Sequence, residues 1–131
     1  MDAMIYPATW SVHAVRWSVS LHMVALLVQL VAMLLFLSGR PEGFFAHSGN
    51  AWVVLLLGAA QLLAVLACSP ARANRFYTAT ALIVVIAEAL EIYLGSNGLR
   101  FAHVTLAMII LGFSLTLLIR TITAPWAVSK A

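Results

Sequence analysis

The stretch WVVLLLGAAQLLAVLA, residues 52–67, decides the fold class of this chain. It lacks the alternation of lipid-facing and lumen-facing residues that a strand of a membrane β-barrel requires. A helix needs about 20 mostly apolar residues to cross the ~30 Å hydrocarbon core of a bilayer, and this stretch supplies most of one. The stretch therefore predicts an all-α protein that lies in a membrane.

The composition of the whole chain agrees with this prediction. The 131 residues are 64% hydrophobic and 8% charged, and the mean hydropathy is +1.06. A soluble domain needs far more charge on its surface, so that class is excluded. The sequence pI of about 9.6 comes from very few charges. We therefore expect the lipid bilayer as the surroundings of the chain and no nucleic-acid partner.

Four apolar runs have the length of a membrane-spanning helix: about 17–38, 47–68, 76–95 and 101–120. The short connections GRPEGFFA, SPARAN and SNGLR are rich in residues that favour turns. Short connections make successive helices antiparallel neighbours. We expect residues 1–131 to form a single domain, an integral membrane four-helix bundle of up-down-up-down topology.

The distribution of basic residues predicts the orientation of this bundle. One side of the membrane would carry five basic residues and the other only Arg40 and Arg100; the five are Arg16, Arg72, Arg75, Arg120 and Lys130. Because Lys and Arg accumulate in cytoplasmic loops, we expect both termini in the cytoplasm. The segment before the first run is expected to lie along the interface, with Trp10 and Trp17 at headgroup depth.

The tripeptide Phe-Ala-His occurs twice, ending at His47 and at His103, 56 residues apart. Gly39 and Gly95 each precede the histidine by eight residues. This echo predicts a duplicated helical hairpin whose halves are related by an axis along the membrane normal. Such an axis places equivalent residues of the second and fourth helices across the bundle at equal depth. His47 and His103 are therefore expected to face each other near the outer surface.

Two facing histidines on diagonal helices predict a haem site, because haem iron is held by axial ligands of this kind. Cys68 is the single cysteine, which excludes a Cys-x-x-Cys-His attachment sequence, so any cofactor must be held by other residues. Arg40 and Arg100 are then candidates to pair with the haem propionates. Three aromatic residues are candidates to pack on the macrocycle: Phe45, Phe101 and Trp52.

Glu88 and Glu91 lie inside the third apolar run, where a carboxylate is costly and indicates a function or a buried partner. Their spacing places them on one helical face. With His47 and His103 they are alternative ligands for a single metal ion. Glu88 can instead hydrogen-bond Gln29 or Gln61, or handle protons. His22 is interpreted as a hydrogen-bonded interior residue, and His13 as interfacial.

Two segments, AHSGNAWVVLLLGAAQLL and YLGSNGLRFAHVTLAMIILG, carry a resemblance to known families. They resemble small four-helix bacterial membrane proteins of unknown function and one half of haem A synthase. The second family implies that His47 and His103 are axial ligands of a b-type haem. Ser48 and Val104 follow these histidines where haem A synthases commonly have a polar residue such as Arg, which argues against synthase activity.

These features predict a haem-b-binding protein of the bacterial inner membrane, with a role in electron transfer or haem handling. Such a protein would be a carrier more than an enzyme, because almost no chain lies outside the membrane. Two alternatives stay open. One is a cofactor-free accessory subunit packed against other membrane protein subunits, and the other is a His/Glu metal site or proton-handling protein.

Overall fold

The computed structural model of the protein describes residues 9–68, 71–72 and 74–125. Within these residues the chain forms four helices, which are α1 (Thr9–Leu37), α2 (Pro41–Ala67), α4 (Arg75–Ser96) and α5 (Arg100–Thr123). Each of the four is long and apolar enough to cross a membrane. The predicted all-α, four-helix membrane bundle is confirmed.

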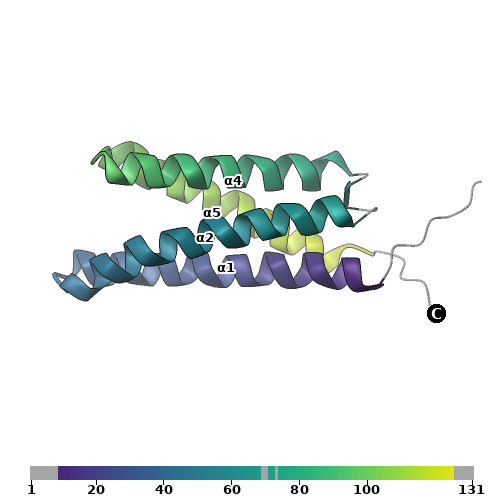
Figure 1. Ribbon diagram of the computed structural model, residues 1–131, viewed down its shortest axis with the longest axis horizontal. Helices are drawn as coiled ribbons and strands as arrows, with labels where there is room; N and C mark the ends of the chain where they lie inside the picture. Colours follow the sequence, from purple (N-terminus) through teal and green to yellow (C-terminus); the bar gives the residue numbers. More distant parts are fainter. Residues whose placement is uncertain (1–8, 69–70, 73, 126–131) are drawn as a thin grey trace, which may run out of the picture.

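The helices are arranged as a square in which each packs against two neighbours. α1 and α4 both pack against α2 and α5, so α1 and α4 lie on one diagonal and α2 and α5 on the other. Both tight turns, α1–α2 and α4–α5, lie at one end, which we call the turn end (left in Figure 1). The start of α1, the end of α5 and the α2–α4 connection lie at the other, which we call the terminal end (Figure 1).

The two tight turns have the same backbone structure. Gly39 has a φ of +85° and Gly98 a φ of +71°, values that favour glycine over residues with a Cβ. The residue after each glycine donates its backbone N–H to the carbonyl five residues earlier, at 3.1 Å after Gly39 and at 3.0 Å after Gly98. This pattern is a Schellman motif, which satisfies the last carbonyls of α1 and α4.

The two turns show that the predicted repeat matched the wrong pair of glycines, Gly39 and Gly95. The partner of Gly39 in structure is Gly98, whereas Gly95 lies inside α4. His47 and His103 therefore follow their turn glycines by eight and five residues respectively. The difference is close to one helical turn of about 3.6 residues, so both histidines can still face the bundle interior.

α1 begins at Thr9, earlier than the predicted start at residue 17. The added turns are held by packing, because Val12, Val15 and Val19 are all buried at helical spacing. Trp10 and Trp17 lie on the opposite, exposed side of this helix. Part of the expected interfacial segment is thus a continuation of the spanning helix. Residues 1–8 of this segment lie outside the described residues, and so does Lys130, one of the basic residues used to predict the orientation.

α2 begins at Pro41, six residues before the predicted start at His47. Proline is well suited to the first turn of a helix, where its missing N–H costs no hydrogen bond. Gly43 is buried, and a Cβ on it would overlap the backbone of Phe36 at the end of α1. The Pro and Gly that suggest a loop in the sequence therefore start a helix that packs closely on its neighbour.

A buried apolar core holds the terminal end of the bundle together. All four helices and the α2–α4 connection contribute to it, and its members are Val12, Val15, Val19, Val65, Cys68, Ala71, Tyr77, Ala81 and Leu117. Two further contacts link helices there, since Tyr77 donates its hydroxyl to the Arg120 carbonyl at 3.1 Å and the Arg120 guanidinium lies 4.1 Å from the Phe76 ring centre. Polar side chains take the place of this core toward the turn end.

We predict that Gly43→Ala destabilises the protein by about 1–3 kcal/mol, because the new methyl group overlaps backbone that cannot rotate away. Gly49→Ala is the matched control on the same helix. Nothing lies within 4 Å of a Cβ at Gly49, so this change should be neutral or stabilise by up to about 1 kcal/mol. Thermal unfolding in detergent measures both. Equal effects of the two substitutions would contradict the close approach of α1 and α2.

Candidate functional site

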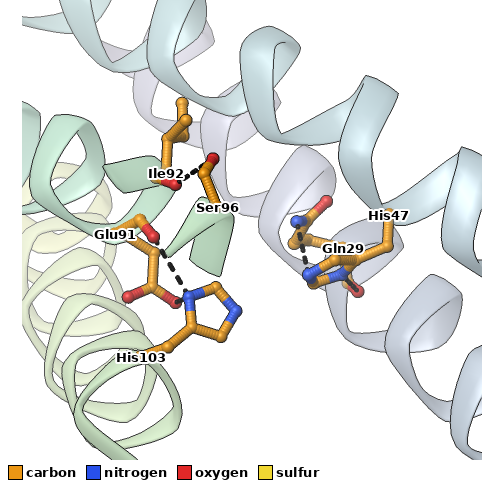
Figure 2. Close-up of polar contacts among 6 residues, drawn as sticks. All are labelled: Gln29, His47, Glu91, Ile92, Ser96 and His103. Carbon is orange, nitrogen blue, oxygen red and sulfur yellow. Dashed lines mark hydrogen bonds and ion pairs between the residues drawn. The ribbon is translucent and has the colours of Figure 1, made fainter. Parts of the chain in front are cut away.

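His47 on α2 and His103 on α5 face each other across one diagonal of the bundle. Their ring centres lie 6.0 Å apart and the ring planes are inclined by 80°. Figure 2 shows the two rings approaching from opposite hairpins, His47 beside Gln29 and His103 beside Glu91. The structure therefore brings together the two histidines that the sequence placed at one depth.

The His103 ring is oriented by α4. Its Nδ1 lies 3.0 Å from the Glu91 Oε1 and 3.1 Å from the Glu91 carbonyl oxygen, so an Nδ1–H donates to both. A Cβ at Gly95 would lie 2.9 Å from His103 Cε1, which shows that this glycine makes room for the ring. A hydrogen bond of this kind at Nδ1 leaves Nε2 as the nitrogen available to a ligand.

The His47 ring is oriented by α1. Its Nδ1 lies 3.4 Å from the Gln29 backbone oxygen, and its Nε2 lies 3.5 Å from the Gln29 side-chain nitrogen. Gln29 is in turn fixed by Asn50, whose amide donates to Gln29 Oε1 at 2.8 Å and to the Ala25 carbonyl at 2.9 Å. Both histidines are thus positioned by a neighbouring helix of their own hairpin.

A cavity of about 120 Å³ lies between the two hairpins and touches both histidines. Its polar lining comes from Gln29, His47, Glu88, Glu91 and His103. The remaining wall is apolar and comprises Leu26, Leu30, Met33, Ala51, Val54, Val104, Ala107, Met108, Ile110 and Leu111. Such a site, apolar with a few converging polar groups, is typical of a binding site for a small molecule or cofactor.

A second polar cluster crosses the other diagonal of the bundle. His22 Nε2 on α1 lies 2.5 Å from Glu88 Oε1 on α4, and His22 Nδ1 lies 3.1 Å from Gln61 Oε1 on α2. All three side chains are buried. An Nδ1–H that donates to Gln61 leaves Nε2 and Glu88 to share one proton. The cluster therefore links three helices through hydrogen bonds in the bundle interior.

The interpretation of His22 as a hydrogen-bonded interior residue is confirmed. The partners expected for Glu88 are corrected. Glu88 pairs with His22 and not with Gln29 or Gln61. In a first helix that started at residue 17, as predicted, His22 would lie only about one and a half turns from the helix start. With α1 beginning at Thr9, His22 lies near the middle of the helix and reaches the level of Glu88.

Glu88 fits closely against α2. A Cβ on Gly58 would overlap Glu88 Oε2, and this oxygen has no hydrogen-bond partner within the described part of the chain. Glu88 also lines the cavity next to both histidines of the turn end. Gly58 thus makes room for the carboxyl group, as Gly95 does for His103.

The other predicted site residues lie at the surface. Arg40 and Arg100 are exposed at the turn end, beside the two tight turns. The predicted packing residues Phe45, Phe101 and Trp52 are 73%, 87% and 59% exposed and do not line the cavity. The apolar wall of the site comes instead from leucine, methionine and alanine residues farther inside the bundle.

Gln29 and Asn50 are site residues that sequence reasoning did not connect with the histidines. Both are amides in apolar runs, and such residues commonly bond across helices. Polar amides are rare in these apolar runs, and this rarity was the feature of the sequence that could have pointed to Gln29 and Asn50.

The structure does not assemble a ligand set for a single metal ion. No three His, Cys, Asp or Glu side chains come together in residues 9–68, 71–72 and 74–125. His47, His103, Glu88 and Glu91 therefore do not form one compact metal site.

No protein-family pattern, curated protein or solved structure matches this chain. The resemblance to haem A synthase accordingly rests on the two quoted segments alone.

A double-mutant cycle tests the contact between Gly58 and Glu88. We predict that Gly58→Ala destabilises the protein by about 1–3 kcal/mol, because the new methyl group displaces the Glu88 carboxyl from His22. In a Glu88→Ala background the same change should cost much less, with a coupling of about 0.5–3 kcal/mol.

Gly112→Ala is the control for this cycle, since nothing lies within 4 Å of a Cβ at that position. Unfolding in a denaturing detergent gives the four free energies. Additive effects of Gly58→Ala and Glu88→Ala would show that the two residues do not touch in the membrane.

Proposed function

We propose that the protein binds one haem b between His47 and His103 and serves as an electron-transfer or haem-handling component of the bacterial inner membrane, with both termini in the cytoplasm. The observation that carries the proposal is that two histidines from opposite hairpins face each other inside the bundle, which is how axial ligands of a haem are arranged. The ring centres are 6.0 Å apart.

The orientation of the rings supports axial ligation. Metal-binding histidines nearly always donate their second ring N–H to a carboxylate or a backbone carbonyl. His103 does so toward Glu91, and His47 has its Nδ1 near the Gln29 carbonyl. Haem also suits a site with two protein ligands, because the porphyrin supplies the other four. A lone metal ion would need a third protein ligand or water.

The volume of the cavity sets a requirement for this proposal. At about 120 Å³ it is smaller than the ~300 Å³ at which pockets for cofactor-sized molecules begin. The two hairpins must therefore move apart around the macrocycle, and the Gln29 amide must leave His47 Nε2. Met33 and Met108 in the wall have flexible side chains that can repack against a flat ring system.

The topology favours such an opening at the turn end. Each turn there joins helices of one hairpin, and the only chain segment between the hairpins is the α2–α4 connection at the terminal end. The large apolar core also lies at the terminal end. The hairpins can thus separate near the histidines while they stay packed at the opposite end. The exposure of Arg40 and Arg100 at the turn end supports a role in pairing with propionates that project toward water.

The distribution of arginines supports the proposed orientation. Arg72, Arg75 and Arg120 lie at the terminal end, and Arg40 and Arg100 lie at the turn end. The positive-inside rule then assigns the terminal end to the cytoplasm. The haem site would lie nearer the outer surface of the inner membrane.

Optical spectra of the purified protein, oxidised and then reduced with dithionite, test the proposal. We expect a Soret band and sharp α and β bands on reduction, and a b-type product on extraction into alkaline pyridine. His47→Ala and His103→Ala should each abolish the bis-histidine spectrum. His13→Ala, an exposed histidine near the terminal end, is the matched control and should leave the spectrum unchanged.

Two results would contradict the haem proposal. A colourless protein that stays colourless after expression with added haem, and that contains no metal, would leave the accessory-subunit alternative. A spectrum that survives His47→Ala but is lost in His22→Ala would place the cofactor on the other diagonal.

A further inference from the structure

The cavity toward the turn end is lined by two thioether side chains as well as by two imidazole rings. Met33 on α1 and Met108 on α5 both border it, beside the two histidines. The haem proposal uses these methionines only as flexible packing residues. Imidazole nitrogen is a good ligand for copper, and thioether sulfur selects its monovalent form, Cu(I). The cavity thus combines the donor atoms of a Cu(I) site.

The nitrogen atoms of the two rings are arranged to hold a metal. Figure 2 shows Nε2 of each ring on the side that faces the other ring. His103 donates from Nδ1 to Glu91, whose Oε1 lies 3.0 Å away, and His47 Nδ1 lies 3.4 Å from the Gln29 carbonyl oxygen. Partners of this kind orient the ring of a metal-binding histidine. The contact of His47 Nε2 with the Gln29 side chain is long, at 3.5 Å, so a metal ion can replace it.

A single ion fits the cavity without any separation of the hairpins. The cavity volume of about 120 Å³ is several times the ~10–15 Å³ that one water molecule requires. Met33 is partly buried, whereas Met108 is 63% exposed. A methionine side chain has three rotatable bonds and adapts to its surroundings. Met33, as the more enclosed of the two, is therefore assigned as the thioether ligand, and Met108 supplies a second sulfur at the rim.

The charge around the cavity favours a monovalent ion. With Glu91 as the carboxylate and His103 as a neutral ring that donates from Nδ1, this pair carries −1. An ion of charge +1 on His103 Nε2 is then balanced inside the bundle, whereas a divalent ion would leave a charge that is costly to bury. The second carboxyl group, Glu88, is already engaged by His22.

The number of ligands also favours copper over zinc. Structural zinc sites are closed by four ligands of the Cys, His, Asp or Glu type. Among the described residues no three such side chains come together. Cu(I) is satisfied by two imidazole nitrogens, with or without a thioether as a third ligand. The set of two histidines and a methionine therefore matches Cu(I) and leaves Zn²⁺ short of ligands.

We propose that the haem-free protein binds one Cu(I) ion between Nε2 of His47 and Nε2 of His103, with the sulfur of Met33 as the third ligand. Copper stays monovalent throughout, and binding consists only of an exchange of ligands. The inference goes beyond the proposed function and does not rest on it. Because haem and Cu(I) would use the same two nitrogen atoms, each chain holds one or the other.

An anaerobic titration of the haem-free protein tests this inference. The full chain, produced in cells that cannot make haem, is mixed with Cu(I) bound to a coloured chelator such as bicinchoninate. The wild type should withdraw one Cu(I) ion per chain from the chelator. His47→Ala and His103→Ala should each abolish this transfer, because they remove a ligand. His13→Ala, an exposed histidine near the terminal end, is the control and should bind like the wild type.

Two conservative variants test the thioether and the charge. Met33→Leu keeps the size of the side chain and should weaken Cu(I) binding, and the double variant with Met108→Leu should weaken it further. Met23→Leu is the matched control, since Met23 is buried on the same helix and does not line the cavity. Glu91→Gln keeps an acceptor for His103 Nδ1 but removes the charge, and it should weaken binding about 10–100-fold.

X-ray absorption at the copper edge gives a readout that requires no histidine variant. The spectrum of the loaded wild type should show monovalent copper with both nitrogen and sulfur neighbours. The sulfur contribution should be lost in the double methionine variant and kept in Met23→Leu.

Several results would overturn the copper site. These are no withdrawal of Cu(I) by the wild type, binding that survives both histidine variants, or Zn²⁺ that displaces Cu(I) at equal concentration. A copper spectrum without sulfur, together with unchanged affinity in the double methionine variant, would overturn the assignment of Met33.

The outcomes for copper and for haem are separate. A protein that shows haem bands but binds no Cu(I) in its haem-free form contradicts this inference alone. A protein that binds Cu(I) through both histidines and never shows haem bands contradicts the haem proposal and supports the copper site.

Discussion

A carboxyl group inside a bilayer must find its partners within the protein, because hydrocarbon offers none. In this bundle Glu88 meets that requirement through His22. The hydrogen bond between them joins α1 and α4, two helices that lie on a diagonal and do not pack against each other. Gln61 adds α2 to the same cluster. The rotation of three helices about their axes is therefore tied to one buried hydrogen-bonded group.

The two ends of the bundle have different physical character. The terminal end is closed by small and branched apolar residues such as Val15, Val65 and Leu117. Toward the turn end, polar side chains and a cavity separate the hairpins. The buried apolar core is thus concentrated at the terminal end, and the cavity with its polar lining lies toward the turn end.

Glycine serves two purposes in this structure. Gly39 and Gly98 adopt a positive φ that ends a helix in a tight turn. Gly58 and Gly95 lie inside helices, where the missing side chain makes room for Glu88 and for the His103 ring respectively. The second use couples backbone packing directly to the polar groups of the site, because any larger residue at these positions would move the carboxyl or the imidazole.

The sequence by itself determined that the chain spans a membrane as four helices and that His47 and His103 lie at one level, because helix length, turn residues and spacing are local properties. It did not determine the starts of α1 and α2, which depend on the packing of Val12 and on the contact of Gly43 with Phe36. Nor did it pair His22 with Glu88. Lipid and protein interior are both apolar, so a run of Leu, Val and Ala does not indicate which of its faces points inward. Only the tertiary structure decided which face of each helix points inward, through the pairing of a few polar side chains. That choice also decided which residues form the site.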